Sequence, residues 1–196
     1  MRTPLIFALV LLGLCLNCFV VCQEIPSDRN WDFTIWSSVA TGEENTNSFS
    51  EAQIVRTGIF AGRILTRRPG TGWTSGALEY GFSLAPVFVQ LRPETLHGVA
   101  FEPITLRWNS GRRAGTAVPY IELAGGGLHT NANLPAGDTS NFNFTARGGA
   151  GVSFQNTSSH ALDLALSWSH ISNANLGRRN PEFNGIELRV TYHWFR

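Results

Sequence analysis

Lysine is absent from this chain of 196 residues: all 15 basic residues are arginine, set against 14 acidic residues. The formal net charge of +1 gives no general signal for a polyanionic partner, so nucleic-acid binding is not expected. Guanidinium groups suit carboxylate and phosphate partners, and they suit a packed ionic interior equally well. Charged residues make up only 15% of the chain, whose length suits one domain of low charge density.

Cysteine is absent after residue 22, because all three cysteines (Cys15, Cys18 and Cys22) lie in the first segment. If that segment is removed, the mature chain has no disulfides and no cysteine-ligated metal. Four histidines are scattered without ligand spacing: His97, His129, His160 and His193. No nucleotide or phosphate-loop motif is present. We therefore expect neither a metal nor another cofactor.

Long apolar runs are also missing after the first segment, so no spanning helix is expected there. At the start of the chain, Arg2 precedes an apolar stretch over residues 4–21, and a cleavage point fits residues 20–23. A basic start and an apolar middle are typical of a secretory signal peptide. We predict a signal peptide at 1–22 and one domain at 23–196, with an uncleaved transmembrane helix or a lipoprotein anchor at Cys22 as alternatives.

The hydrophobic residues that remain alternate with polar ones. This period of two is typical of strands, and it is clearest at 142–155 and 185–195. Pro103 breaks the alternation in its segment and predicts a β-bulge there. Eight segments are predicted as strands: 31–42, 52–65, 77–90, 96–109, 117–129, 142–155, 161–172 and 185–195.

Such alternation fits either a soluble lipocalin-like barrel with an apolar interior or an outer-membrane barrel whose apolar side faces lipid. The polar sides of the segments carry full charges that can pair in a narrow lumen: Glu79, Arg107, Glu122, Arg147, Asp163, Glu187 and Arg189. Aromatic residues gather at segment ends, as an interfacial girdle requires: Trp31, Trp36, Trp108, Trp168, Trp194 and Phe195. The chain also ends on an alternating aromatic strand, 192–195. We therefore predict an all-β fold, an eight-stranded antiparallel transmembrane β-barrel in the outer membrane.

Two polar residues interrupt the lipid-facing stripe of the segment 161–172. His170 and Ser172 share the face of Leu162, Leu164, Leu166 and Trp168. With both termini in the periplasm, this segment runs outward and brings the pair close to the outer-leaflet headgroups. Asn184 has the same parity on the next strand, where antiparallel pairing can bring it beside His170.

Polar groups facing lipid are costly without partners. A histidine beside a serine suggests a nucleophile with its general base, and an asparagine can hold the imidazole in place. The simpler alternative is that His170 and Ser172 only mark the membrane interface.

A longer stretch of sequence favours the catalytic interpretation. It comprises His170-Ile171-Ser172-Asn173-Ala174-Asn175, then Asn180-Pro181, then Asn184-Gly185. Over residues 165–195 it resembles the active-site signature of lipid A 3-O-deacylases, which remove an acyl chain ester-linked to the glucosamine disaccharide of lipid A. The resemblance implies Ser172 as nucleophile, His170 as base and Asn173 as the oxyanion-hole donor. It implies lipid A, or lipopolysaccharide, as the partner in the membrane.

Two positions depart from that signature. Asn184 stands where the family places an acidic residue, and Asn175 stands where glycine is common. Glu182 is the nearest loop carboxylate, whereas Glu187 has lumen parity and is a poor candidate.

Three functions therefore stay open. Outer-membrane phospholipase A also uses serine, histidine and asparagine, so phospholipid hydrolysis is the first alternative to lipid A deacylation. A non-catalytic small barrel of the OmpA or OmpX kind is the second. Arg178 and Arg179 lie in the loop beside the site and are predicted to bind lipid A phosphates, or else to form a solvated basic loop. The sequence also leaves a homodimer open.

Overall fold

A computed structural model describes residues 30–42, 52–68, 74–112 and 114–196 of the chain. The predicted signal peptide at 1–22 lies outside these residues. The described part forms eight strands: β1 (Trp31–Gly42), β2 (Gln53–Arg68), β3 (Gly76–Arg92), β4 (Leu96–Ser110), β5 (Ala117–Leu134), β6 (Ser140–Thr157), β7 (His160–Ser172) and β8 (Phe183–Phe195).

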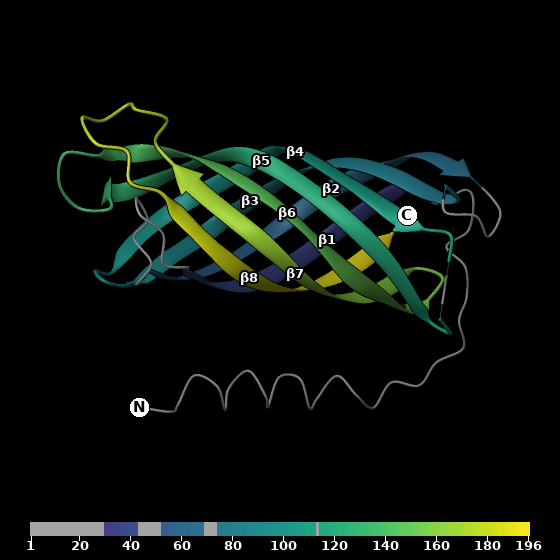
Figure 1. Ribbon diagram of the computed structural model, residues 1–196. Helices are drawn as coiled ribbons and strands as arrows, with labels where there is room; N and C mark the ends of the chain where they lie inside the picture. Colours follow the sequence, from purple (N-terminus) through teal and green to yellow (C-terminus); the bar gives the residue numbers. More distant parts are fainter. Residues whose placement is uncertain (1–29, 43–51, 69–73, 113) are drawn as a thin grey trace.

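The strands form one closed antiparallel barrel in which each pairs with its sequence neighbours and β8 pairs with β1. The strands are steeply tilted relative to the barrel axis (Figure 1). The loop between β7 and β8 and the loop between β5 and β6 lie at one end, and the C-terminus lies at the other. Within the described ranges there is no helix long and apolar enough to cross a membrane. The predicted eight-stranded antiparallel barrel is confirmed.

The strands β5 and β6 are longer than their alternation predicted. The predicted fifth strand ends at residue 129, because the polar residues Thr130 and Asn131 interrupt its apolar alternation. In the structure β5 continues to Leu134. The side chains of Thr130 and Asn131 bond to neighbouring backbone. Asn131 Oδ1 accepts from the backbone N–H of His97 at 2.9 Å, and Thr130 Oγ1 donates to the carbonyl of Asn141 at 3.1 Å.

The bulge predicted at Pro103 is confirmed by the register of β4 against β5. Phe101 faces Gly127 and Ile104 faces Gly125, so two residues of β4 span the position of one residue of β5. Gly126 is that one residue, and a Cβ added to it would overlap the carbonyl oxygen of Phe101. Only glycine allows this close approach of the two backbones.

The outer surface of the barrel is apolar on every strand. Side chains such as Ile121, Leu123 and Leu166 are 60%, 63% and 58% exposed. An apolar surface of this extent is unfavourable in water and is expected on a lipid-facing wall. The barrel therefore carries its apolar side outward, as an outer-membrane barrel does, and the lipocalin-like alternative is wrong.

Two of the six predicted girdle aromatics point inward instead. Trp36 is 3% exposed, its Nε1 donates to Ser83 Oγ at 3.2 Å, and the Arg189 guanidinium lies 4.0 Å from its ring centre. Phe195 is 5% exposed and stacks on His193. Alternation explains Trp36, which shares the parity of the buried Asp32 on β1. Proximity to a strand end was therefore a weaker guide to orientation than parity.

The barrel interior holds a closed ring of three arginines and three glutamates. Arg56 pairs with Glu187 and lies 3.8 Å from Glu102, which is 3.1 Å from Arg147. Arg147 pairs with Glu122, which is 3.8 Å from Arg189, and Arg189 closes the ring to Glu187 at 3.1 Å. The sequence predicted paired charges in the lumen but did not identify Arg56 or Glu102. Alternating signs leave the ring with no net charge, which reduces the cost of burying it.

A second buried cluster lies nearer the C-terminal end. His193 bonds to Asp32 at 2.7 Å and to Asp163 at 2.9 Å, and Asp163 also pairs with Arg107 at 2.6 Å. His193, which has no ligand spacing in the sequence, is therefore an interior ion-pair partner.

The loop end of the interior is apolar. Buried side chains from most of the strands meet there, and the largest of them are Phe88, Leu128, Leu134, Ile171 and Phe183. Ile171 belongs to β7 and Phe183 belongs to β8. This apolar layer holds the loop ends of both strands from the inside.

Candidate active site

The three predicted catalytic residues come from the adjacent strands β7 and β8. His170 and Ser172 are two residues apart on β7, which places them on the same outward face. His170 is directly opposite Asn184 of β8 in the antiparallel register. Ile171 and Phe183, with the opposite parity, are 2% and 0% exposed. Their burial fixes both strand ends, so the outward residues are held by rigid backbone.

The side chains of these residues form one hydrogen-bonded chain. His170 Nε2 lies 2.9 Å from Ser172 Oγ, and His170 Nδ1 lies 2.8 Å from Asn184 Oδ1. The Asn184 oxygen can only accept, so Nδ1 carries the proton and donates. Nε2 is then left with a lone pair facing the serine hydroxyl, which is the arrangement that a general base needs.

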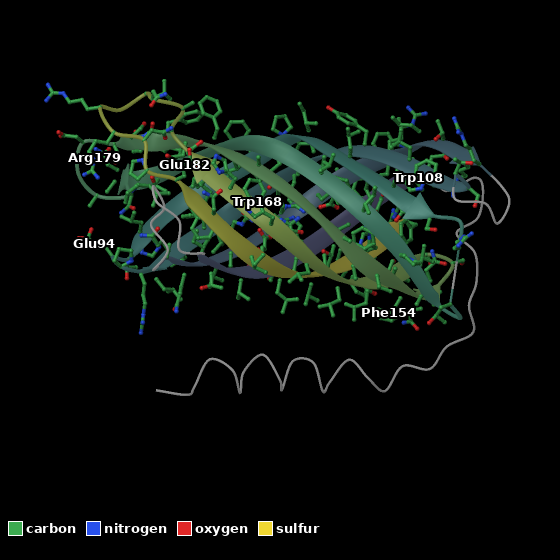
Figure 2. All side chains as sticks on the ribbon, in the orientation of Figure 1. Glu94, Trp108, Phe154, Trp168, Arg179 and Glu182 are labelled. Carbon is green, nitrogen blue, oxygen red and sulfur yellow. The ribbon has the colours of Figure 1, made fainter. Side chains whose placement is uncertain are left out.

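This chain lies on the lipid-facing wall rather than in the lumen. His170, Ser172 and Asn184 are each partly buried. Trp168 precedes His170 by two residues on the same face of β7, and its side chain is 45% exposed. Its ring stacks on that of His170, with a ring-centre distance of 5.5 Å and an interplanar angle of 17°. Figure 2 shows Trp168 on the barrel wall and Glu182 near the loop end. An ester that reaches Ser172 therefore approaches from the bilayer side.

The loop that follows the serine begins at Asn173, whose hydrogen bonds connect several parts of it. Asn173 is fully buried, its backbone N–H donates to Asn180 Oδ1 at 2.8 Å, and its Nδ2 donates to the carbonyl of Arg179 at 2.8 Å. Its own carbonyl accepts from the N–H of Leu176 at 2.9 Å. Asn173 thus holds the loop together, and among the described residues one hydrogen of its Nδ2 remains for another acceptor.

The backbone turns sharply directly after Asn173. Ala174 and Asn175 have φ values of 49° and 65°, in the left-handed region. Asparagine tolerates this region better than other residues with a side chain. The departure at Asn175 therefore keeps the backbone conformation for which glycine is common there.

The 173–182 loop rests on the loop between β5 and β6. The N–H of Arg179 donates to the carbonyl of Asp138 at 2.9 Å. A Cβ added to Gly177 would lie 2.6 to 2.8 Å from the backbone of Thr139, so the two loops touch at Gly177. These contacts leave the side chains of Arg178 and Arg179 exposed, at the end of the barrel that Figure 2 marks with Arg179.

Glu182 extends the hydrogen-bonded chain by one residue. Its Oε2 accepts from Asn184 Nδ2 at 3.4 Å, so it touches Asn184 and not His170. The sequence identified it only as the nearest loop carboxylate. Glu187 is fully buried in the interior ring, in agreement with its lumen parity. No group of three His, Cys, Asp or Glu side chains suited to a metal ion occurs within the described part of the chain.

A closed eight-stranded barrel with an apolar outer wall defines the class of small outer-membrane β-barrel proteins. Solved structures share the fold. The outer-membrane enzyme PagL matches with a TM-score of 0.58 at 17% identity, over 81% of this chain and 97% of its own. Neisserial surface protein A matches with a TM-score of 0.59 at 12% identity, over 84% and 96%. No curated protein sequence matches the chain.

The family is shown by sequence. The lipid A 3-O-deacylase (PagL) family matches residues 62–193, which include β7, β8 up to His193 and the loop between them. The chain belongs to the lipid A 3-O-deacylase (PagL) family. It is a lipid A deacylase-like barrel of the cell outer membrane, and at this coarse level it is an ester hydrolase.

Proposed function

We propose that this barrel removes an ester-linked acyl chain from lipid A, with Ser172 as nucleophile and His170 as general base. The observation that supports this most strongly is the chain of hydrogen bonds from Ser172 through His170 to Asn184, at 2.9 and 2.8 Å, on the lipid-facing wall. Membership of the family supplies the substrate class.

The reaction follows from the positions of the protons. Ser172 Oγ gives its proton to His170 Nε2 and bonds to the ester carbonyl carbon, which makes a tetrahedral oxyanion. As this collapses, the bond to the sugar oxygen breaks, and that oxygen takes the proton from His170. Water then attacks the acyl-serine, His170 accepts its proton and returns it to Ser172 Oγ, and the fatty acid leaves. Asn184 Oδ1 holds the Nδ1–H throughout.

The oxyanion needs a hydrogen-bond donor beside Ser172. Asn173 is the candidate that the resemblance implies, and its remaining Nδ2 hydrogen is the donor that the loop leaves unused. Its full burial means that the loop around Ala174 and Asn175 must shift for this hydrogen to reach a substrate.

Arg178 and Arg179 are proposed to bind the phosphates of lipid A, because both are exposed in the loop beside Ser172. Replacing both by glutamine is expected to raise KM for phosphorylated lipid A about tenfold, since hydrogen bonds to charged groups contribute about 1.5–3 kcal/mol. The KM for a dephosphorylated lipid A is expected to stay unchanged. Arg92→Gln, also exposed at the loop end, is the matched control. An unchanged KM for phosphorylated lipid A in the double variant, or an equal rise in KM for both substrates, would contradict this role.

Phospholipid hydrolysis is the second candidate, and it is favoured by one observation. Asn184, an amide, takes the position beside His170 that an acidic residue has in the family signature. Outer-membrane phospholipase A also combines an asparagine with its serine and histidine. Both reactions use the same residues, so only the substrate separates them.

The test is mass spectrometry of the lipids of cells with and without this protein. Loss of one hydroxyacyl group from lipid A, with phospholipids unchanged, supports lipid A deacylation. Unaltered lipid A with accumulating lysophospholipid supports the phospholipase. Unchanged lipids of both kinds, with the barrel folded in the membrane, would contradict the proposed activity and support a non-catalytic barrel.

A further inference from the structure

Asn184 has a symmetric side-chain shape but two chemically different ends. Turning its amide by half a turn would exchange Oδ1 and Nδ2 with little change in packing. An Nδ2 facing His170 would donate to Nδ1 and force the ring proton onto Nε2. Nε2 would then donate to Ser172 Oγ instead of accepting its proton. The orientation of one amide therefore decides whether His170 can act as a base.

Glu182 discriminates between these two orientations. A carboxylate has acceptors only, so it requires Nδ2 of Asn184 on its side, at the observed 3.4 Å. That leaves Oδ1 on the side of His170, where it lies 2.8 Å from Nδ1. Glu182 lies at a bridge position directly before β8 and precedes Asn184 by two residues, so the two side chains point the same way.

Glu182 also carries the negative charge that Asn184 lacks. The imidazolium formed during acyl transfer is usually stabilised by a carboxylate in direct contact. Here the carboxylate is displaced by one amide, whose dipole has its positive end at Glu182 and its negative end at His170. The charge therefore acts on His170 through Asn184.

We infer that Glu182 is a positioning residue of this site: it fixes the orientation of the Asn184 amide and thereby the tautomer of His170. This inference rests on the proposed function for its catalytic consequence. Its structural part, the ring tautomer, can be measured without any substrate.

The principal test is Glu182→Gln in the full chain, refolded in detergent micelles. Glutamine has the same shape but offers both a donor and an acceptor, so it no longer selects one orientation of Asn184. We expect kcat for an ester substrate to fall about tenfold with KM unchanged, since a fully wrong tautomer costs about 10⁴-fold in a comparable triad. Glu94→Gln removes a charge from an exposed turn at the same end of the barrel and is expected to leave kcat unchanged.

The second variant is Asn184→Asp, which has acceptors on both oxygens and needs no orientation. In this background Glu182→Gln is expected to leave kcat unchanged or to raise it, because it removes a like charge beside the new carboxylate. A residue that only supports the fold would lower kcat equally in both backgrounds, and that result would overturn the inference.

The third measurement is ¹⁵N NMR of the histidine rings, with the His170 signals assigned from their loss in His170→Gln. In the unaltered chain the proton is expected on Nδ1, and in Glu182→Gln a fraction is expected on Nε2. An unchanged tautomer together with an unchanged kcat would overturn the inference. A shifted tautomer in a protein that cleaves neither lipid A nor phospholipid would overturn the proposed function and leave the inference intact.

Discussion

Replacing Ser172 by alanine is expected to reduce kcat for lipid A deacylation by about 10⁴-fold or more, because loss of the nucleophile from such a triad costs about 10⁶-fold in the best-measured case. The hydroxyl lies 2.9 Å from His170 Nε2 and has no role in the interior packing of the barrel. Removing one oxygen from a partly exposed position should leave the fold unchanged. The measurement is lipid A mass spectrometry together with initial rates on purified lipid A.

The control for this prediction is Ser159→Ala, which removes a hydroxyl from the turn between β6 and β7, at the opposite end of the barrel. There Ser159 Oγ lies 3.5 Å from Thr157 Oγ1. The rates of this variant should match those of the unaltered chain. Equal rates for Ser172→Ala and the unaltered chain would show that Ser172 is not the nucleophile, and the proposed mechanism would then be wrong.

Replacing Arg147 by methionine is expected to lower the free energy of unfolding by about 3–5 kcal/mol, because it removes one partner from a buried ion-pair network. Glu102 and Glu122 would then share the barrel interior without the guanidinium between them. Their remaining cations in the ring are Arg56 and Arg189, each at 3.8 Å. The measurement is urea unfolding of the refolded barrel in detergent micelles, followed by tryptophan fluorescence.

Arg92→Met is the matched control, because Arg92 is exposed at the end of β3 and its loss should change the free energy by no more than about 0.5 kcal/mol. A similar small effect for Arg147→Met would show that the ring does not stabilise the barrel. Replacing all the charged residues of the ring together by apolar residues of similar volume is a different experiment, since such exchanges are often neutral or stabilising.

Much of the wall of the barrel could be predicted from local pattern. The alternation of apolar and polar residues indicated eight strands and their two faces, because neighbouring side chains of a strand point to opposite sides. The same rule placed His170, Ser172 and Asn184 on one face of β7 and β8. The orientations of Trp36 and Phe195 were wrong because position at a strand end was used in place of parity.

The contacts inside the barrel were beyond local pattern. Arg56 and Glu102 lie on β2 and β4, and Glu187 lies on β8, so their pairing depends on how the strands close around the lumen. Parity identifies which residues point inward, but it does not say which of them meet across the interior. The apolar layer at the loop end likewise forms only when residues from many strands are brought to the same height.

The sequence by itself determined the class of barrel, the outward face and the serine, histidine and asparagine on it, since these depend on residues adjacent along a strand or across one pair of strands. Only the tertiary structure decided what each asparagine does. The loop closes around Asn173 and uses most of its donors, while Asn184 bridges Glu182 and His170. The reason is that a hydrogen bond depends on distances of a few tenths of an ångström, and those distances are set by the packing of β7 and β8 on the interior.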